Sequence, residues 1–335
     1  MKRIAFERET FEAELLDPGD RFEPKKARVE VRRDPLTGHS ARILPAGSFP
    51  SPARHDLERL AAETRDVCPF CAGKLEEQTP RLPAEVCAEG RIRSGEAVLF
   101  PNLVPYAKWS SVSVYSPERH LLPLAELTPR LLADNLRVQR DFGRAVLAFD
   151  ESARWISVNA NHLPPAGSSI FHPHLQGSAN PLPTTMQRLL DAVFPEDVRA
   201  YVAAEREDGS RLVASSEAID WIASFAPLGP GEICAFVAGI GSPPELADAQ
   251  VDQLACGISA VLGMYDELGF QSFNLAFYGL PGAETLLLRV VARAYFGAAE
   301  RSDAMWSERL HWECATDLEP EHLAERARAA FARSS

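Results

Sequence analysis

The sequence has few cysteines, very few lysines and no long apolar segment, and these scarcities exclude several classes of protein. Six cysteines in 335 residues are too few for a disulfide scaffold, so we expect a cytoplasmic protein with reduced thiols. No apolar run approaches the roughly 18 residues of a membrane helix. The acidic N-terminal segment, MKRIAFERETFEAELLD, also lacks the apolar region of a signal peptide. We therefore expect no membrane contact.

Positive charge is also scarce. The formal net charge of −12 argues against binding to nucleic acid or to an anionic membrane surface. The bases are 30 arginines and 5 lysines. Arginine presents a planar fork that suits phosphate, although a GC-rich coding sequence would produce the same bias. The hydrophobic fraction of 46% is ordinary, which excludes disorder and fibrous repeats.

Predicted strands and helices occur in the same order twice. The first half is predicted to contain two strands, a helix and two strands, over 97–102, 110–116, 127–149, 155–161 and 171–179. The second half repeats this order over 220–227, 231–239, 243–269, 273–279 and 286–296. This repetition predicts an α+β fold of two fused halves, each with an antiparallel sheet and a helix packed on one face.

Three regions are expected along the chain. Residues 1–27 have no clear period and are expected to form an N-terminal arm. Residues 28–195 form the half that carries the chemistry, because only this copy contains the His-Pro-His motif. Residues 196–335 form the second half, which completes the pocket or the core. In the first half, Ser111 and Ser113 alternate with valines, which predicts a half-buried strand.

The most informative segment is NANHLPPAGSSIFHPHLQ, residues 159–176. His172 and His174 are two positions apart on a predicted strand, so their side chains should point to the same face, with Gln176 beyond them. Pro173 is tolerated only at an edge or a bulge, so this strand should border a cleft. The preceding loop offers small residues whose amides and hydroxyls can bind phosphate oxygens: Gly167, Ser168 and Ser169.

The CxxC motif formed by Cys68 and Cys71 is a metal knuckle, a redox dithiol or a chance pair. A thioredoxin-type motif should open a helix after a strand, and the preceding AETRDV does not form one. A second CxxC is missing, so the remaining ligands of a tetrahedral site would be His120 and one histidine of the His-Pro-His motif. Otherwise the cysteines are two buried hydrophobic residues.

Together these motifs resemble those of the galactose-1-phosphate uridylyltransferases, which belong to the histidine-triad superfamily. The motifs in the first half are RRDPLTG, CPFCAGK, LFPN, SPERH and N-x₅-GSS-x₂-HPHLQ. The second half contributes DWIASFAP, YDELG, SFNLAFYG and ECATDLEPEHLAERAR, so the resemblance spans roughly residues 28–330. It implies two fused histidine-triad-type halves and a homodimer.

The resemblance also implies a role for each matching residue. His174 matches the nucleophile that attacks the α-phosphorus of a nucleotide sugar and becomes a nucleotidyl-histidine. Hydrogen bonds to the phosphate oxygens are implied for Ser169 and Gln176. Substrate binding is implied for Arg32, Arg33, Asn102 and Asn161, and we add Gly167 and Ser168 of the phosphate loop. A structural zinc ion without an open position is implied for Cys68, Cys71, His120 and His172.

The sequence departs from this family at a second metal site and at the sugar phosphate. Val291 and Arg293 stand where two histidines of the second site would fall, so we expect no iron-type site. No lysine follows Lys108, and Ala315 stands near a glutamine that the family uses on the sugar phosphate. The nucleotidyl-transfer motifs are therefore intact, whereas the sugar-recognition motifs differ.

Three functions are compatible with these motifs. The first is transfer of a nucleoside monophosphate, UMP in the family, from a nucleotide sugar to a sugar 1-phosphate. The second resolves the same intermediate differently: with phosphate, as a phosphorylase of ADP-glucose or dinucleoside polyphosphates, or with water, as a hydrolase. The third is a catalytically silent nucleotide-binding protein, and the intact HPHLQ and GSS motifs argue against it.

Overall fold

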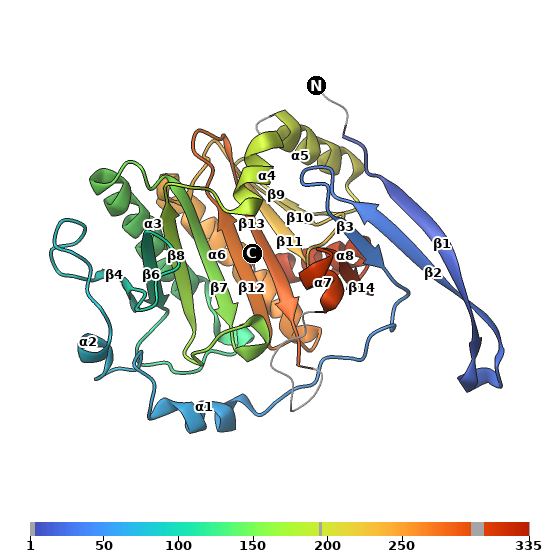
Figure 1. Cartoon of the computed structure of the whole chain (residues 1–335), viewed down its shortest axis with the longest axis horizontal. Coiled ribbons are helices and arrows are strands. Elements are labelled where there is room, and N and C mark those ends of the chain that lie inside the picture. Colours follow the sequence, from blue (N-terminus) through green and yellow to red (C-terminus); the bar gives the residue numbers. More distant parts are fainter. Residues whose placement is uncertain (1–3, 194–195, 296–304, 335) are drawn as a thin grey trace.

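The structure is a computed structural model that describes residues 4–193, 196–295 and 305–334. Its centre is a ten-stranded antiparallel sheet in the order β4-β5-β6-β8-β7-β12-β13-β11-β10-β9 (Figure 1). The first half supplies β4 Ile92–Ser94, β5 Ala97–Pro101, β6 Trp109–Val114, β7 Trp155–His162 and β8 His174–Asn180. The second half supplies β9 Leu212–Ser215, β10 Ile219–Ala223, β11 Ile233–Ala238, β12 Ser272–Tyr278 and β13 Thr285–Arg293.

The two halves meet where β7 pairs with β12. Six residue pairs join these strands, from Phe273 opposite His162 to Tyr278 opposite Ser157. The predicted duplication is therefore confirmed, but the halves share one continuous sheet. The expected boundary at residue 195 and the predicted end of the last strand at residue 296 lie outside the described residues.

One long helix from each half covers the same face of this sheet. These helices are α3 (Pro129–Phe149) and α6 (Asp248–Glu267), which pack together behind the strands, and α8 (Pro320–Ser334) packs against α6 (Figure 1). As predicted, Thr128 caps α3, because its side chain accepts a hydrogen bond from the Leu131 amide. Leucine, valine and phenylalanine side chains of β11, β12 and β13 meet these helices in the main hydrophobic core.

Shorter segments cover the two ends of the opposite face. In the second half, α4 (Thr185–Val193) and α5 (Glu196–Asp208) pack on Cys234, Phe236 and Leu287. In the first half, Cys68, Phe70 and Leu75, the last of which begins α2 (Leu75–Gln78), pack on β5 and β6. The helix α1 (Leu57–Arg65) packs on Leu121, Leu163 and Phe171. Between these covers, β7, β8 and β12 present half-exposed polar side chains: Asn159, Asn161, Gln176 and Asn274. No helix among the described residues is both long and apolar enough to cross a membrane.

The strand β6 is buried on both faces, so the expectation of a half-buried strand is wrong. Ser111 and Ser113 are 0% exposed beneath α3. Gln139 of α3 satisfies both hydroxyls, accepting from Ser111 at 3.2 Å and donating to Ser113 at 2.6 Å. Serine therefore alternates with valine here because a buried amide provides partners, and not because one face meets water.

A second sheet in the order β1-β2-β3-β14 begins with a long hairpin. Its strands are β1 (Arg8–Asp17), β2 (Glu23–Arg33), β3 (Ser40–Ile43) and β14 (Cys314–Thr316), and the turn η1 (Pro18–Asp20) lies at the hairpin tip. The hairpin projects away from the body (Figure 1). The boundary expected between residues 27 and 28 falls inside β2, so arm and body are joined by one unbroken strand.

Candidate active site and metal cluster

His174 is the first residue of β8, an interior strand that lies between β6 and β7. His172 and Pro173 precede the strand, so the expectation that both histidines lie on one face of a strand, with Pro173 at an edge or a bulge, is wrong. Pro173 is tolerated because it lies before the ladder begins and removes no strand hydrogen bond. The His172 ring turns toward the two cysteines, whereas the ring of Phe70 lies 5.5 Å from that of His174.

The backbone fixes the protonation of His174. Its Nδ1 lies 2.8 Å from the carbonyl oxygen of His172, which can only accept a hydrogen bond. Nδ1 therefore carries the proton and Nε2 keeps its lone pair. Burial lowers the pKa of His174, although the same carbonyl opposes this effect, so the ring is neutral at pH 7. A neutral imidazole with a free Nε2 is a competent nucleophile.

The loop before His174 has an unusual backbone. Leu163, which is 1% exposed, has φ +66° and ψ 169°, a conformation that residues other than glycine rarely adopt. Gly167 has φ +90°, which a residue with a Cβ rarely adopts. The Ser168 hydroxyl donates to the Ile170 carbonyl at 2.6 Å, so it serves the loop itself, whereas Ser169 is exposed. Strain of this kind is typical of functional loops.

Two asparagines hold this loop from the sheet below it. Asn161 on β7 and Asn274 on β12 lie opposite each other, with their side-chain amides 2.8 Å apart. Asn274 donates to the Ala166 carbonyl at 2.9 Å, and the amide nitrogen of Asn161 can also reach that oxygen at 3.2 Å. The second half therefore contributes a positioning residue, Asn274, which the sequence reasoning missed because SFNLAFYG has no histidine.

Replacing Asn274 with alanine is expected to loosen the 163–169 loop without unfolding the protein. Loss of one hydrogen bond corresponds to about 1.4 kcal/mol, so amides of this loop should exchange with solvent about tenfold faster. Hydrogen exchange followed by mass spectrometry measures this rate. Asn274→Asp, which keeps the size but loses the donor, should behave in the same way. Unchanged exchange in both variants would show that Asn161 holds the loop alone.

Asn102 shapes a neighbouring loop. The backbone amide of Asn102 donates to the Ser110 carbonyl at 2.9 Å, and its side-chain Oδ1 accepts from the Val104 amide at 3.1 Å. Asn159 on β7 was not singled out from the sequence, because an asparagine in a strand carries no motif. It lies opposite Gln176 on β8.

Cys68, Cys71, His120 and His172 come together as predicted, with one potential ligand atom from each lying within 4.8 Å of the others. The Sγ of Cys71 lies 3.2 Å from Nδ1 of His120 and 3.6 Å from Nδ1 of His172. The Sγ of Cys68 lies 3.8 Å from Nδ1 of His172. Ligands 2.0–2.3 Å from a tetrahedral ion are separated by about 3.5 Å, which these distances fit.

Hydrogen bonds behind the cluster favour metal binding. His172 donates its Nε2 proton to the Ser116 carbonyl at 2.9 Å, and Nε2 of His120 lies 2.9 Å from the Thr64 hydroxyl. The His172 ring thereby directs an unprotonated Nδ1 at the cysteines, and the His120 ring does so when its Nε2 donates to Thr64, as metal-bound histidines do. Burial lowers the pKa of His172 to about 4, which keeps it neutral. Burial and Cys68 raise the pKa of Cys71 to about 11, so two thiolates here need a cation.

We compared the sequence and the structure with those of known proteins. No protein-family model matches the chain. An uncharacterized protein of Archaeoglobus fulgidus is 30% identical over 316 residues, which cover 90% of this chain and 92% of that protein. The chain belongs to one family with this archaeal protein.

Solved structures show which fold this family has. ADP-glucose phosphorylase from Arabidopsis thaliana has a TM-score of 0.64 at 18% identity, covering 90% of this chain and 98% of its own. A uridylyltransferase structure has a TM-score of 0.59 at 19% identity, with the same two coverages. The predicted fold of two histidine-triad-type halves is thus confirmed. At 18% and 19% identity, these structures show that the fold is shared and show nothing about activity.

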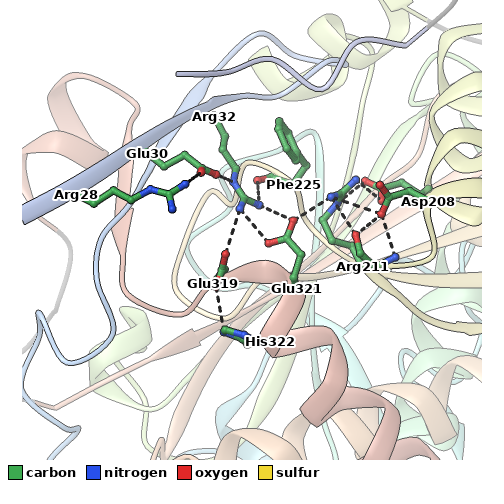
Figure 2. A network of polar contacts seen from close by, with 11 residues as sticks. Arg28, Glu30, Arg32, Asp208, Arg211, Phe225, Glu319, Glu321 and His322 are labelled. Carbon is green, nitrogen blue, oxygen red and sulfur yellow. Dashed lines mark hydrogen bonds and ion pairs between the residues drawn. The ribbon is translucent and has the colours of Figure 1, made fainter. Parts of the chain in front are cut away.

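Arg32 does not reach the site around His174. Its guanidinium is 1% exposed and donates to Glu30 at 2.6 Å and to both carboxylate oxygens of Glu321, at 3.0 and 2.9 Å (Figure 2). Glu321 also accepts from Arg211, which is 1% exposed. Arg32 thus joins β2 to α8 and to Arg211, the residue before β9, in a buried ion network. Its neighbour Arg33 is exposed and donates to the Gly38 carbonyl at 3.3 Å.

Replacing Glu321 with alanine is expected to destabilise the protein by about 3–5 kcal/mol, because it leaves Arg32 and Arg211 buried with one fewer counter-charge. Urea unfolding measures this loss. The matched control is Glu319→Ala, since Glu319 is 44% exposed and lies 3.8 Å from Arg32, and it should cost less than about 1 kcal/mol. Equal losses in the two variants would contradict the central position of Glu321.

The ion pair of Arg32 and Glu321 also predicts that the stability of the protein depends on pH. Burial raises the pKa of Glu321, but Arg32 outweighs burial and holds the pKa below its ordinary value. A carboxylate with a lowered pKa stabilises the fold above the pKa that it has in the unfolded chain. The difference in stability between the wild type and Glu321→Ala should therefore shrink as the pH falls below about 4.

Proposed function

We propose that the protein is a nucleotidyltransferase that carries a nucleoside monophosphate on His174. Following the resemblance, the donor is a nucleotide sugar, the transferred group is UMP and the acceptor is a sugar 1-phosphate. One observation carries this proposal. His174 is a neutral histidine whose Nδ1 is bound to a backbone carbonyl, and it lies beside a strained glycine-serine loop.

The reaction is written from the residues of this chain. The lone pair of His174 Nε2 forms a bond to the α-phosphorus, and the bond from that phosphorus to the oxygen of the leaving sugar 1-phosphate breaks. The Nδ1 proton stays in place, and the His172 carbonyl stabilises the positive charge that develops on the ring. A phosphate oxygen of the acceptor then attacks the same phosphorus, and the bond to Nε2 breaks. Donor and acceptor therefore bind in turn.

The remaining predicted residues support this chemistry by position. Gln176 lies two residues beyond His174 on the same strand face and is half-exposed. Ser169 is exposed in the loop that Asn161 and Asn274 anchor, and we assign both Ser169 and Gln176 to the phosphate oxygens. A properly placed donor of this kind contributes about 3 kcal/mol to the transition state. Gly167 allows the loop backbone to turn toward the substrate.

We assign zinc to the cluster of Cys68, Cys71, His120 and His172. Two thiolates and two imidazoles are ligands that zinc prefers, and four protein ligands leave no open position for a substrate. The ion would act structurally, by holding the segment around Phe70 and fixing His172. Because the His172 carbonyl binds His174, this fixation also orients the nucleophile.

The acceptor separates two versions of the proposal. A phosphorylase uses inorganic phosphate where a uridylyltransferase uses a sugar 1-phosphate, and structures with either name share this fold. Arg32 is occupied by Glu30 and Glu321, so we do not retain it as a phosphate ligand, whereas the exposed Arg33 remains a candidate.

A panel of donors tests the proposal. Purified protein is incubated separately with UDP-sugars, ADP-glucose and dinucleoside polyphosphates, then quenched and digested. The His174 peptide should gain the mass of one nucleoside monophosphate with one class of donor. Discharge of the isolated adduct by sugar 1-phosphate, phosphate or water then identifies the acceptor. If no donor labels the peptide, the covalent mechanism is wrong.

A further inference from the structure

The sheet face that carries His174 continues as an open surface toward β13. Even-numbered residues of β8 and β12 and odd-numbered residues of β7 and β13 point away from α3 and α6, because their neighbours in each strand pack in the cores beneath those helices. On this face Asn161 lies opposite Asn274, and Asn274 lies opposite Val291. All three are half-exposed. The half-exposed side chains of these four strands, here called the floor, therefore reach from β8 to β13.

Arg293 is the one charged side chain of the floor among the described residues. It is the last residue of β13, two positions beyond Val291, and it is half-exposed. The other arginine of this strand, Arg289, is 4% exposed and donates to Glu232 at 2.6 Å. An anion that lies on the floor therefore meets amide, apolar and aromatic side chains everywhere except at Arg293.

The pairing of the strands fixes how far Arg293 lies from His174. One residue from each strand forms a row across the sheet: Gln176, Asn159, Ala276 and Arg289. His174 lies two residues from this row, and Arg293 lies four residues from it in the same direction. With strands about 4.8 Å apart and a rise of about 3.4 Å per residue, their Cα atoms are roughly 16 Å apart. Both side chains project over the floor, which leaves space for a diphosphate between them.

The direction of the displacement leads toward Arg293. Attacking and leaving atoms are in line in phosphoryl transfer, so the leaving oxygen lies on the far side of the phosphorus from Nε2 of His174. On the β6 side of His174, the Phe70 ring is 5.5 Å away and packs with Val112 and Val114, so this side is filled. The far side therefore lies over β7 and β12. The β-phosphate of a nucleotide sugar then extends toward β13.

We propose that Arg293 binds the phosphate that leaves with the sugar, and that the acceptor phosphate occupies the same place. This inference rests on the proposed nucleotidyl transfer. Leaving group and acceptor are both phosphates with a charge of about −2 at neutral pH, and the planar fork of arginine matches their oxygens. As the bond to the α-phosphorus breaks, its electron pair goes to the leaving oxygen, and Arg293 stabilises that negative charge. Water carries no charge for Arg293 to bind.

Titration calorimetry with inorganic phosphate and with glucose 1-phosphate tests this site on the full chain without any chemistry. Arg293→Gln should weaken the binding of at least one of them about 10–100-fold, because charge-assisted hydrogen bonds are lost. Arg293→Lys keeps the charge but loses the fork, so its affinity should lie in between. The matched control is Arg130→Gln, which removes the same charge from an exposed position at the start of α3, on the other side of the sheet, and should bind like wild type.

Three results overturn the proposal. The first is a wild type that binds neither phosphate, and the second is equal affinity in wild type and Arg293→Gln. The third is an equal loss in Arg130→Gln, which would show that only the net charge matters. None of these results depends on the formation of a covalent adduct.

Discharge of the nucleotidyl-histidine separates phosphate binding from a structural role. The adduct is formed on wild type and on Arg293→Gln, freed of donor, and mixed with increasing phosphate or glucose 1-phosphate, or with buffer alone. Arg293→Gln should need about 10–100-fold more acceptor for half-maximal discharge, whereas discharge by water should change less than about twofold. Equal changes in both rates would contradict a role in acceptor binding. If wild type forms no adduct, nucleotidyl transfer fails while the calorimetry still decides whether Arg293 binds phosphate, so the two failures are distinguishable.

Discussion

Replacing His174 with glycine is expected to abolish the nucleotide adduct and to lower turnover on the order of 10⁶-fold. This is the typical cost of removing a nucleophile on which a covalent mechanism depends, and it corresponds to about 8 kcal/mol of transition-state stabilisation. The loss should be large because Nε2 of His174 is the atom that bonds to phosphorus. Mass spectrometry of the quenched peptide and steady-state rates with the best donor measure it.

The matched control replaces a different histidine. His322 on α8 has a side chain that is 73% exposed, and it bonds Glu319 at the surface. His322→Gly should label normally and keep its turnover. The thermal unfolding temperature of His174→Gly also has to stay near that of wild type. An adduct of normal mass in His174→Gly would place the nucleophile elsewhere and would contradict the mechanism.

The contrast between His162 and His174 shows when the sequence can predict the role of a histidine. A lone histidine such as His162 is expected to be a core or surface residue, and the structure buries it at 2% exposure, stacked on Phe273 at 5.0 Å. Burial, followed by the nearby His174, lowers its pKa to about 3. His174 was distinguished from it by neighbours within eight residues. A site built from one continuous segment is therefore predictable, because its geometry is local.

The sequence could not predict the side-chain contacts between segments that lie far apart in the chain. The resemblance implied that Arg32 binds substrate, but its side chain bonds Glu30 and Glu321, the second of which lies 289 residues away. Asn274 reaches the 163–169 loop only because β12 pairs with β7 across the two halves. The strand β1 was not predicted, because we found no clear period in residues 1–27.

The contacts between the two halves explain what the second half contributes to the structure. The first half holds His174, the metal cluster and the strained loop, whereas the second half supplies Asn274 beneath that loop. Because β7 and β12 pair directly, the second half also covers a strand edge that the first half alone would expose. The second half is therefore required for the site even though it carries no histidine motif.

Replacing Cys68 with serine is expected to remove the metal and to destabilise the protein by more than about 4 kcal/mol. Loss of a metal site belongs to the few mechanisms that produce changes of this size. Cys68 is 4% exposed, and its segment packs with Phe70 and Leu75 on β5 and β6, so loss of the ion should loosen this whole cover. Elemental analysis should find about one zinc ion per wild-type chain and almost none in Cys68→Ser.

Labelling of His174 gives this prediction a second readout. His172, which we assign to the metal site, supplies the carbonyl that holds Nδ1 of His174, so a chain without metal should label slowly although His174 is intact. Cys87→Ser is the matched control, because Cys87 is half-buried outside the cluster and a hydroxyl can replace its bond to the Arg91 carbonyl. It should keep both zinc and labelling. Iron at comparable stoichiometry in wild type would contradict the assignment of zinc, and normal labelling of metal-free Cys68→Ser would show that the cluster does not orient His174.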